Sequence, residues 1–282
     1  MRSRRRRAEG RMRITSATVA VVTGGASGIG LGIAEAIVDR GGRVVISDIR
    51  QDALPAALDH LNGRAEGARA AGIVADVSNA AEVETLTAFT LETFGRVDLV
   101  CNNAGLVSPA APTWEQDLAT WDRMIRVKIM GVIHGVRAFA PHLVAQGSGH
   151  ILNTASSAGL APLADRSPYT TTMHAVVGLT ETLDVELKRL SSQLGATVLC
   201  PGLVDTPLGA NSAALGAIAA PAGPPVDMRA LRPDILSPRQ VAEAAINAVE
   251  AGRVHVAPGG DVLERARSRV DELLRDIASV AP

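Results

Sequence analysis

Aromatic residues are scarce in this 282-residue chain. They make up 2% of it, with one tyrosine, two tryptophans and three phenylalanines, while 47% of the chain is hydrophobic. The core must therefore be built from Ala, Val, Leu and Ile. Proteins that stack on nucleic-acid bases need exposed rings, so the composition argues against that class of function. It also singles out Tyr169, the one tyrosine, as a residue that needs an explanation.

Cysteine and lysine are equally rare. Cys101 and Cys200 each end an apolar run, which indicates buried, reduced thiols and a cytoplasmic protein. The six histidines show no metal-ligand spacing, so no metal site is predicted. Lys128 and Lys188 are the only lysines among 28 basic residues, and the other 26 are arginines.

Long apolar runs are missing as well. No run reaches the roughly 18 residues that span a bilayer, and no secretory apolar segment follows the N-terminal arginines, so no membrane association is predicted. The first thirteen residues hold seven Arg and one Glu, which leaves 21 basic against 28 acidic residues, a net charge of −7, for the rest. Such an acidic body does not suit nucleic-acid phosphates. Residues 1–16 are predicted to be a disordered basic leader, with Met12 as an alternative start, and residues 17–282 a single domain.

One glycine-rich turn stands out against this background. The stretch from Thr23 to Gly30 follows an apolar run, residues 19–22, and leads into a helix-periodic segment. Gly24 can adopt a positive φ, and Gly28 and Gly30 let a ligand and the strand approach the backbone closely. The helix that begins here directs free N–H groups at the turn, where a pyrophosphate fits. Such a turn can be purely structural, but the strand before it, the helix after it and Asp48 favour a dinucleotide site.

Strands and helices alternate along the chain. This pattern predicts the α/β class, a single Rossmann-type, doubly wound parallel sheet of about seven strands. One long helix is expected over residues 118–146 and another over about 167–190. Residues 207–236, rich in Ala, Gly and Pro, are predicted to form a mobile flap, and an apolar stripe predicts a terminal helix over residues 261–278. The strands are expected at residues 18–22, 43–47, 70–75, 97–101, 150–154, 196–200 and 254–257.

Polar residues follow several of these strands directly. Asp48, Asp76, Asn102, Ser156 and Thr206 all do so. Ligands of doubly wound sheets bind at the carboxyl ends of the strands, so these side chains are expected to border the site.

From about residue 17 to residue 257 the chain resembles a short-chain dehydrogenase/reductase. The resemblance rests on Thr23-Gly24-x-x-x-Gly28-x-Gly30, Asp76-Val77, Asn102-Asn103-Ala104-Gly105, and Pro201-Gly202 with Thr206. In that family Thr206 would hold the nicotinamide carboxamide. The resemblance implies a nicotinamide dinucleotide held by Thr23, Gly24, Ser27, Gly28, Ile29, Gly30, Asp48, Ile49, Asp76, Val77, Asn103, Ala104, Gly105, Tyr169, Pro201, Gly202, Val204 and Thr206.

The charges near the second strand favour NAD as the cofactor. Asp48 should accept hydrogen bonds from the adenosine ribose and repel a 2′-phosphate. Ser27 stands where relatives that prefer NADP often carry a basic residue. Arg50 opposes this reading, because it would favour NADP if it folded inward.

The catalytic residues match the family only in part. The family's site is Asn–Ser–Tyr–Lys, and Tyr169 lies thirteen residues after Ser156, which is the family spacing. Met173 stands where the family has its lysine, and Lys128 stands where it has its asparagine. In the family, the lysine at the position of Met173 lowers the pKa of the tyrosine. We expect either that Lys128 supplies this positive charge in place of that lysine, or that Lys128 is an ordinary solvated charge on a helix.

Two functions remain open at this point. The first is an NAD-dependent secondary-alcohol dehydrogenase or ketone reductase with an apolar small-molecule substrate. The second is a catalytically weak NAD-binding pseudoenzyme that acts as a sensor or assembly partner. The resemblance also implies a homodimer or homotetramer. An apolar pocket is expected from Leu106, Val107, Leu160, Leu163, Leu203 and the flap.

Overall fold

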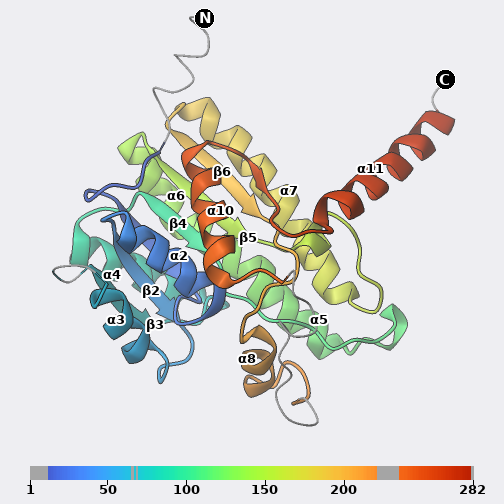
Figure 1. Cartoon of the computed structure of the whole chain (residues 1–282), viewed down its shortest axis with the longest axis horizontal. Coiled ribbons are helices and arrows are strands. Elements are labelled where there is room, and N and C mark those ends of the chain that lie inside the picture. The colour runs from blue at the N-terminus through green and yellow to red at the C-terminus, as the bar shows by residue number, and fades with distance from the viewer. Residues whose placement is uncertain (1–11, 65–66, 68, 221–234, 281–282) are drawn as a thin grey trace, which may run out of the picture.

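Seven parallel strands form one sheet in the order β3-β2-β1-β4-β5-β6-β7, with helices on both faces (Figure 1). The computed structural model describes residues 12–64, 67, 69–220 and 235–280. The predicted doubly wound α/β fold is confirmed. The strands are β1 (Val19–Thr23), β2 (Arg43–Asp48), β3 (Ala70–Val74), β4 (Leu99–Asn102), β5 (Gly149–Thr154), β6 (Leu194–Leu199) and β7 (His255–Val256).

The helices that connect these strands cover both faces of the sheet. The α-helices are α2 (Gly28–Asp39), α3 (Leu54–Asn62), α4 (Ala80–Phe94), α5 (Leu118–Met124), α6 (Gly131–Gln146), α7 (Ser167–Leu190), α8 (Leu208–Ala214), α10 (Pro238–Glu250) and α11 (Val262–Ser279). Short helical segments are η1 (Thr113–Glu115), η2 (Ile125–Met130) and η3 (Ser157–Gly159).

Helix ends follow local sequence signals. Asn79 caps α4 by accepting a hydrogen bond from the Ala81 N–H, and Gly95 ends that helix at φ 76°. Ser237 and Gln240 form a reciprocal capping box at the start of α10. These caps fix where the two helices begin and end, and so how they meet the sheet.

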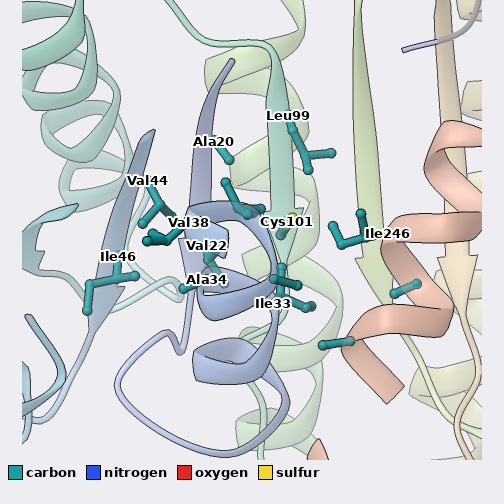
Figure 2. Close-up of a cluster of buried hydrophobic side chains, with 14 of the residues drawn as sticks. Ala20, Val22, Ile33, Ala34, Val38, Val44, Ile46, Leu99, Cys101 and Ile246 are labelled. Carbon is teal, nitrogen blue, oxygen red and sulfur yellow. The ribbon is translucent and has the colours of Figure 1, made fainter. Parts of the chain in front are cut away.

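The core consists of aliphatic layers on both faces of the sheet. Side chains alternate along β1: Ala20 and Val22 face α2 and α10 (Figure 2), while Val21 packs on the opposite side. All five β1 residues are buried, as expected of a parallel strand covered on both faces. The sheet is therefore a rigid base for the residues at its carboxyl edge.

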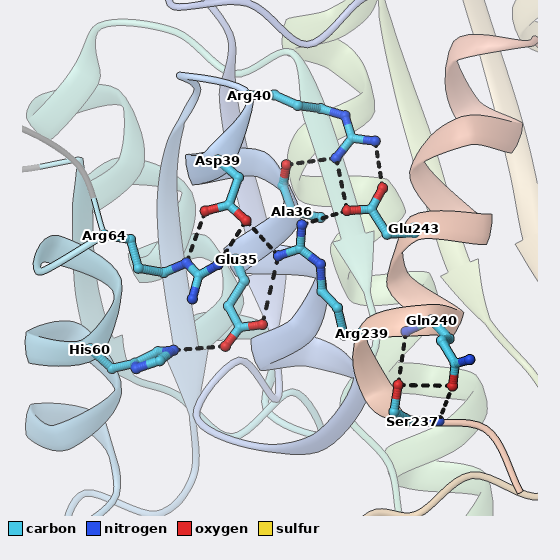
Figure 3. Close-up of polar contacts among 10 residues, drawn as sticks. All are labelled: Glu35, Ala36, Asp39, Arg40, His60, Arg64, Ser237, Arg239, Gln240 and Glu243. Atoms are coloured by element: carbon cyan, nitrogen blue, oxygen red, sulfur yellow. Dashed lines mark hydrogen bonds and ion pairs between the residues drawn. The ribbon is translucent and has the colours of Figure 1, made fainter.

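An ion-pair network joins α2, α10 and the end of α3 on the outer surface (Figure 3). Arg40 binds Glu243 at 2.6 Å, and Arg239 binds Asp39 at 2.7 Å. Asp39 also pairs with Arg64 at 2.7 Å. These arginines hold the pKa of the Asp39 and Glu243 carboxyls below their usual range, chiefly through side-chain hydrogen bonds. The network fixes α2, whose N-terminus faces the predicted cofactor site.

Three predicted segments differ from the structure. The chain joins the core before residue 17, because Ile14 is 7% exposed and packs in the α2 layer; residues 1–11 of the predicted leader lie outside the described part. The predicted helix over residues 118–146 is broken by η2, a π-helical segment. The predicted flap contains α8, and its residues 221–234 lie outside the described part.

Within the described residues, no helix is both long and apolar enough to cross a membrane. The described residues also contain no group of three or more His, Cys, Asp or Glu side chains that could hold a metal ion.

Candidate active site

The glycine turn after β1 brings bare backbone to the start of α2. Gly24 has φ 63°, and a Cβ there would lie 2.9 Å from the Ala104 Cα. A Cβ on Gly30 would lie 2.6 Å from Asn103 Nδ2 and would overlap the Gly24 carbonyl. In the described structure no side chain caps α2 at Ser27, and its first turn holds no acidic residue. The turn therefore leaves N–H groups and positive dipole charge open to an anion, as a pyrophosphate requires.

The ends of β1 and β4 are joined at this turn. Thr23 Oγ1 accepts hydrogen bonds from the backbone N–H of Asn103 at 2.9 Å and of Ala104 at 3.1 Å. Asn103 Nδ2 donates to the Thr23 carbonyl at 3.1 Å, and its Oδ1 accepts from Thr154 Oγ1 at 3.2 Å. These bonds hold the strand ends in one fixed edge. Asn102 faces inward instead, where it is 3% exposed and donates to Asn153.

Arg50 folds inward over the end of β2. Asp48 is buried, and its carboxylate accepts from the Ala26 N–H at 3.2 Å and from Arg50 Nε at 3.4 Å. Arg50 also donates to Ser27 Oγ at 3.1 Å and to Asn211 Oδ1, on α8, at 3.0 Å. Arg50, the residue expected to favour NADP, thus lies beside Asp48 and Ser27, the two residues expected to favour NAD.

The remaining predicted cofactor residues border the same edge. Asp76 follows β3 and accepts from the Ser78 N–H at 2.8 Å, while Val77 is buried against Gly131. Thr206 lies across the glycine turn, since a Cβ on Gly28 would be 3.4 Å from its Cβ. The structure also brings Ile29, Ile49, Gly105, Pro201, Gly202 and Val204 to the carboxyl ends of strands or the segments that directly follow them.

Tyr169 and Ser156 meet as their spacing predicts. A hydrogen bond from Ser156 lowers the pKa of the Tyr169 phenol, but burial has the larger effect and raises the pKa above its usual value. The nearby positive charge of Arg166 also lowers this pKa. Arg166 stands at the N-cap of α7, three residues before Tyr169, and donates to the Ser108 carbonyl.

Met173 is fully buried one turn beyond Tyr169. It packs in an apolar cluster with Ala155, Val176 and Val198, against which Tyr169 also packs. A methionine in this position fills the volume of a lysine stem but brings neither charge nor hydrogen-bond donor. His174 Nδ1 donates to the Thr170 carbonyl at 3.0 Å, and His174 does not replace the lysine.

Lys128 is not a solvated surface charge. It lies in the π-helical segment η2, is 5% exposed, and its side chain crosses the space that a Cβ on Gly105 would occupy. Burial lowers its pKa to about 8. No hydrogen bond or ion pair reaches its ammonium from the part of the chain that the structure describes. The expectation of an ordinary solvated lysine is therefore wrong.

Sequence reasoning missed two contributors to this site. The first is Arg166, which its spacing of three residues from Tyr169 at the start of a helix could have revealed. Asn211 had no such signal, because its contact with Arg50 joins positions 161 residues apart. Part of the flap also reaches the site: Ala217 and Leu106 form a small buried cluster against which Tyr169 packs.

Residues 18–214 match the family model of the short chain dehydrogenase. The chain belongs to the short-chain dehydrogenase family. It is 31% identical to 1-deoxy-11-beta-hydroxypentalenate dehydrogenase of Streptomyces avermitilis, over 93% of this chain and 92% of that one. It is 32% identical to levodione reductase of Leifsonia aquatica, over 85% and 83% of the two chains. A short-chain dehydrogenase/reductase of Burkholderia phymatum, solved in complex with NAD, superposes with a TM-score of 0.83 at 34% identity, covering 94% of this chain and 97% of that one.

Members of this family are oxidoreductases, and the site has the parts of one. It combines an anion-binding turn, a polar strand edge and a paired Ser156 and Tyr169.

Proposed function

We propose that the protein transfers hydride between NAD(H) and a secondary alcohol or ketone of an apolar small molecule. The hydrogen bond between Ser156 and Tyr169 carries this proposal. The nicotinamide cofactor, when bound, supplies the hydride acceptor or donor. The bare backbone at Gly24 and Gly30 and the uncapped start of α2 fit its pyrophosphate.

In this mechanism two hydroxyl groups act on the substrate oxygen. Tyr169 transfers the proton to or from that oxygen, and Ser156 donates a hydrogen bond to the charge that develops on it. The raised pKa of Tyr169 keeps the phenol protonated at neutral pH. A protonated phenol suits ketone reduction, in which it is the acid, whereas alcohol oxidation requires its deprotonation.

The proposal is tested by removing one oxygen atom. Tyr169→Phe keeps the ring and its packing, so we expect NAD(H) binding to change little while kcat falls roughly 10²–10⁴-fold. Initial rates on a panel of secondary alcohols and ketones, beside fluorescence titration of NADH, measure both effects. A variant with near-normal kcat would remove Tyr169 from the acid/base role.

We further propose that Lys128 supplies the cation that the family places at Met173. A buried ammonium that no described residue pairs with interacts strongly with nearby charge because little water screens it. Within ~4–6 Å of the phenol, such a charge favours the phenolate and lowers its pKa by about one to three units. Lys128→Met should then reduce kcat roughly ten- to a thousandfold and shift the alkaline limb of the pH profile upward.

A double-mutant cycle separates this role from a degenerate site. Met173→Lys alone should help little, because two ammonium groups in one pocket repel each other. Lys128→Asn with Met173→Lys rebuilds the family's arrangement and should recover or exceed the starting rate. A coupling energy near zero between positions 128 and 173 contradicts the relocation.

The second candidate is an NAD-binding protein with little turnover. The apolar, fully buried Met173 supports it. In that case NAD binds, no substrate on the panel is converted, and Met173→Lys alone creates activity.

The remaining expectations concern location and partners. The buried free thiols Cys101 and Cys200 support a reducing, cytoplasmic location. The acidic body supports a protein without nucleic-acid partners. We propose a homodimer or homotetramer, as is common among relatives.

A further inference from the structure

Helix α11 leaves the body of the molecule and points away from it (Figure 1). Only its first residue, Val262, is buried, and every residue from Arg267 to Ser279 is exposed. An isolated helix of this length is marginal in water, because nucleation costs nearly as much as its hydrogen bonds return. A partner surface is therefore needed to stabilise it.

The root of α11 is fixed to the active-site region. A Cβ on Gly202 would lie 3.1 Å from Val262 Cγ2. Arg265 donates to Ser157 Oγ and to the Ala161 carbonyl, both at 3.4 Å, in the segment that directly follows Ser156. The helix thus has one anchored end and a long free end.

The free face of α11 carries an apolar seam. Its spacing alternates between three and four residues, which is the heptad pattern of helices that pack on each other. Leu263, Leu273 and Ile277 are 70%, 46% and 55% exposed. The seam consists of Leu263, Ala266, Val270, Leu273 and Ile277 in α11, and of Val280 directly after its last residue.

We propose that α11 pairs in antiparallel orientation with α11 of a second copy of this chain. Placing Val270 opposite Leu273 of the second copy aligns the whole seam, with Leu263 opposite Val280 and Ala266 opposite Ile277. In this register Arg269, beside the seam, faces Asp276 of the second copy. Two-fold symmetry makes the same ion pair twice.

Charge selects this register and this direction. Sliding one helix by a heptad brings Arg269 against Arg269, or Asp276 against Asp276, and like charges repel. In a parallel pair Arg269 would face Leu274 and Arg267 would face Val262, so no attractive ion pair forms. Only the antiparallel, unshifted arrangement places opposite charges together.

The contact draws on apolar side chains along the whole length of the seam. A biological interface needs about 1,000 Å² removed from water, and six seam residues from each copy contribute to this one. The pairing therefore works as one association step of a homo-oligomer.

Charge reversal tests the pairing through the mass of the particle. Arg269→Asp and Asp276→Arg should each weaken association roughly tenfold, and the double reversal should restore it, measured by sedimentation equilibrium. Positions 269 and 276 lie about 10.5 Å apart along one helix, so restoration cannot come from within a single copy. Arg275→Asp changes a charge on the side away from the seam and should leave association unchanged. Unchanged mass in both single variants, or no recovery in the double variant, overturns the pairing.

Cross-linking gives a second test that does not depend on charge. Val270→Cys with Leu273→Cys should form a covalent dimer on oxidation, whereas Ser268→Cys, away from the seam, should not. Native Cys101 and Cys200 are buried and do not compete. Because both tests measure assembly, their failure is distinct from the absence of dehydrogenase activity; equal cross-linking of both cysteine variants also overturns the pairing.

Discussion

Burial of one ammonium group is the unusual feature at the scale of single residues. Lys128 is enclosed beside Gly105, and its pKa falls to about 8 because the charged form is taken out of water. In the unfolded chain the same amine titrates near 10.5. The fold therefore bears a free-energy cost whenever this lysine is charged, as is common for groups kept for function.

We expect Lys128→Met to stabilise the cofactor-free protein at neutral pH. A folded pKa below the unfolded value means that the penalty is fully present below about pH 8 and disappears as pH rises past 10.5. The gain at pH 7 should be roughly 3 kcal/mol and should shrink to near zero by about pH 10.5. Urea unfolding across this pH range measures it.

Lys188→Met is the matched control for this measurement. Lys188 is half-exposed and pairs with Asp184 at 2.6 Å, so its removal should bring no gain in stability at any pH. A Lys128→Met variant that is equally or less stable than the parent at pH 7 would mean that the ammonium is well compensated in the fold.

At the scale of elements, α8 and the end of β2 are linked through one side chain. Arg50 bridges Asp48, Ser27 and Asn211, and so connects the predicted adenosine end of the site to the flap region. Its charge partly offsets the repulsion that Asp48 alone would exert on a 2′-phosphate. We therefore expect NAD to bind more tightly than NADP, with a smaller margin than Asp48 and Ser27 alone predict.

Arg50→Ala should widen that margin. Loss of a charge-assisted contact should weaken NADP binding roughly ten- to a hundredfold, and NAD binding much less. Calorimetric titration with both cofactors measures the ratio. Asn211→Ala breaks the link to α8 but keeps the charge, so it should leave the ratio unchanged; a ratio that shifts equally in both variants would assign selectivity to α8 instead.

Elements also show where sequence reasoning reached its limit. The apolar period predicted one helix over residues 118–146, because periodicity reports only which face is buried. Apolar periodicity does not reveal the wider π-helical turn of η2, the segment that contains Lys128. Such π-helical turns are frequent at functional sites. The spacing of thirteen residues between Ser156 and Tyr169 is compatible with the hydrogen bond that joins them in the fold, and their catalytic roles stay a prediction.

At the scale of the whole molecule, the architecture follows from alternation and glycine placement. Strand, turn and helix repeat with apolar strands throughout, and few topologies satisfy that pattern. Contacts between distant parts of the chain were harder to predict from the sequence. The inward fold of Arg50 and the burial of Lys128 depend on tertiary neighbours, and spacing along the chain carries no record of them.

The whole molecule also has very few side-chain amines that a reagent could modify. Of the two lysines in the chain, Lys188 is half-exposed and Lys128 is enclosed. Reagents that acylate amines can therefore modify Lys188 in the native protein, whereas Lys128 becomes reactive only when its surroundings open. The rate of acylation at Lys128, measured by mass spectrometry, therefore reports how often the active site opens.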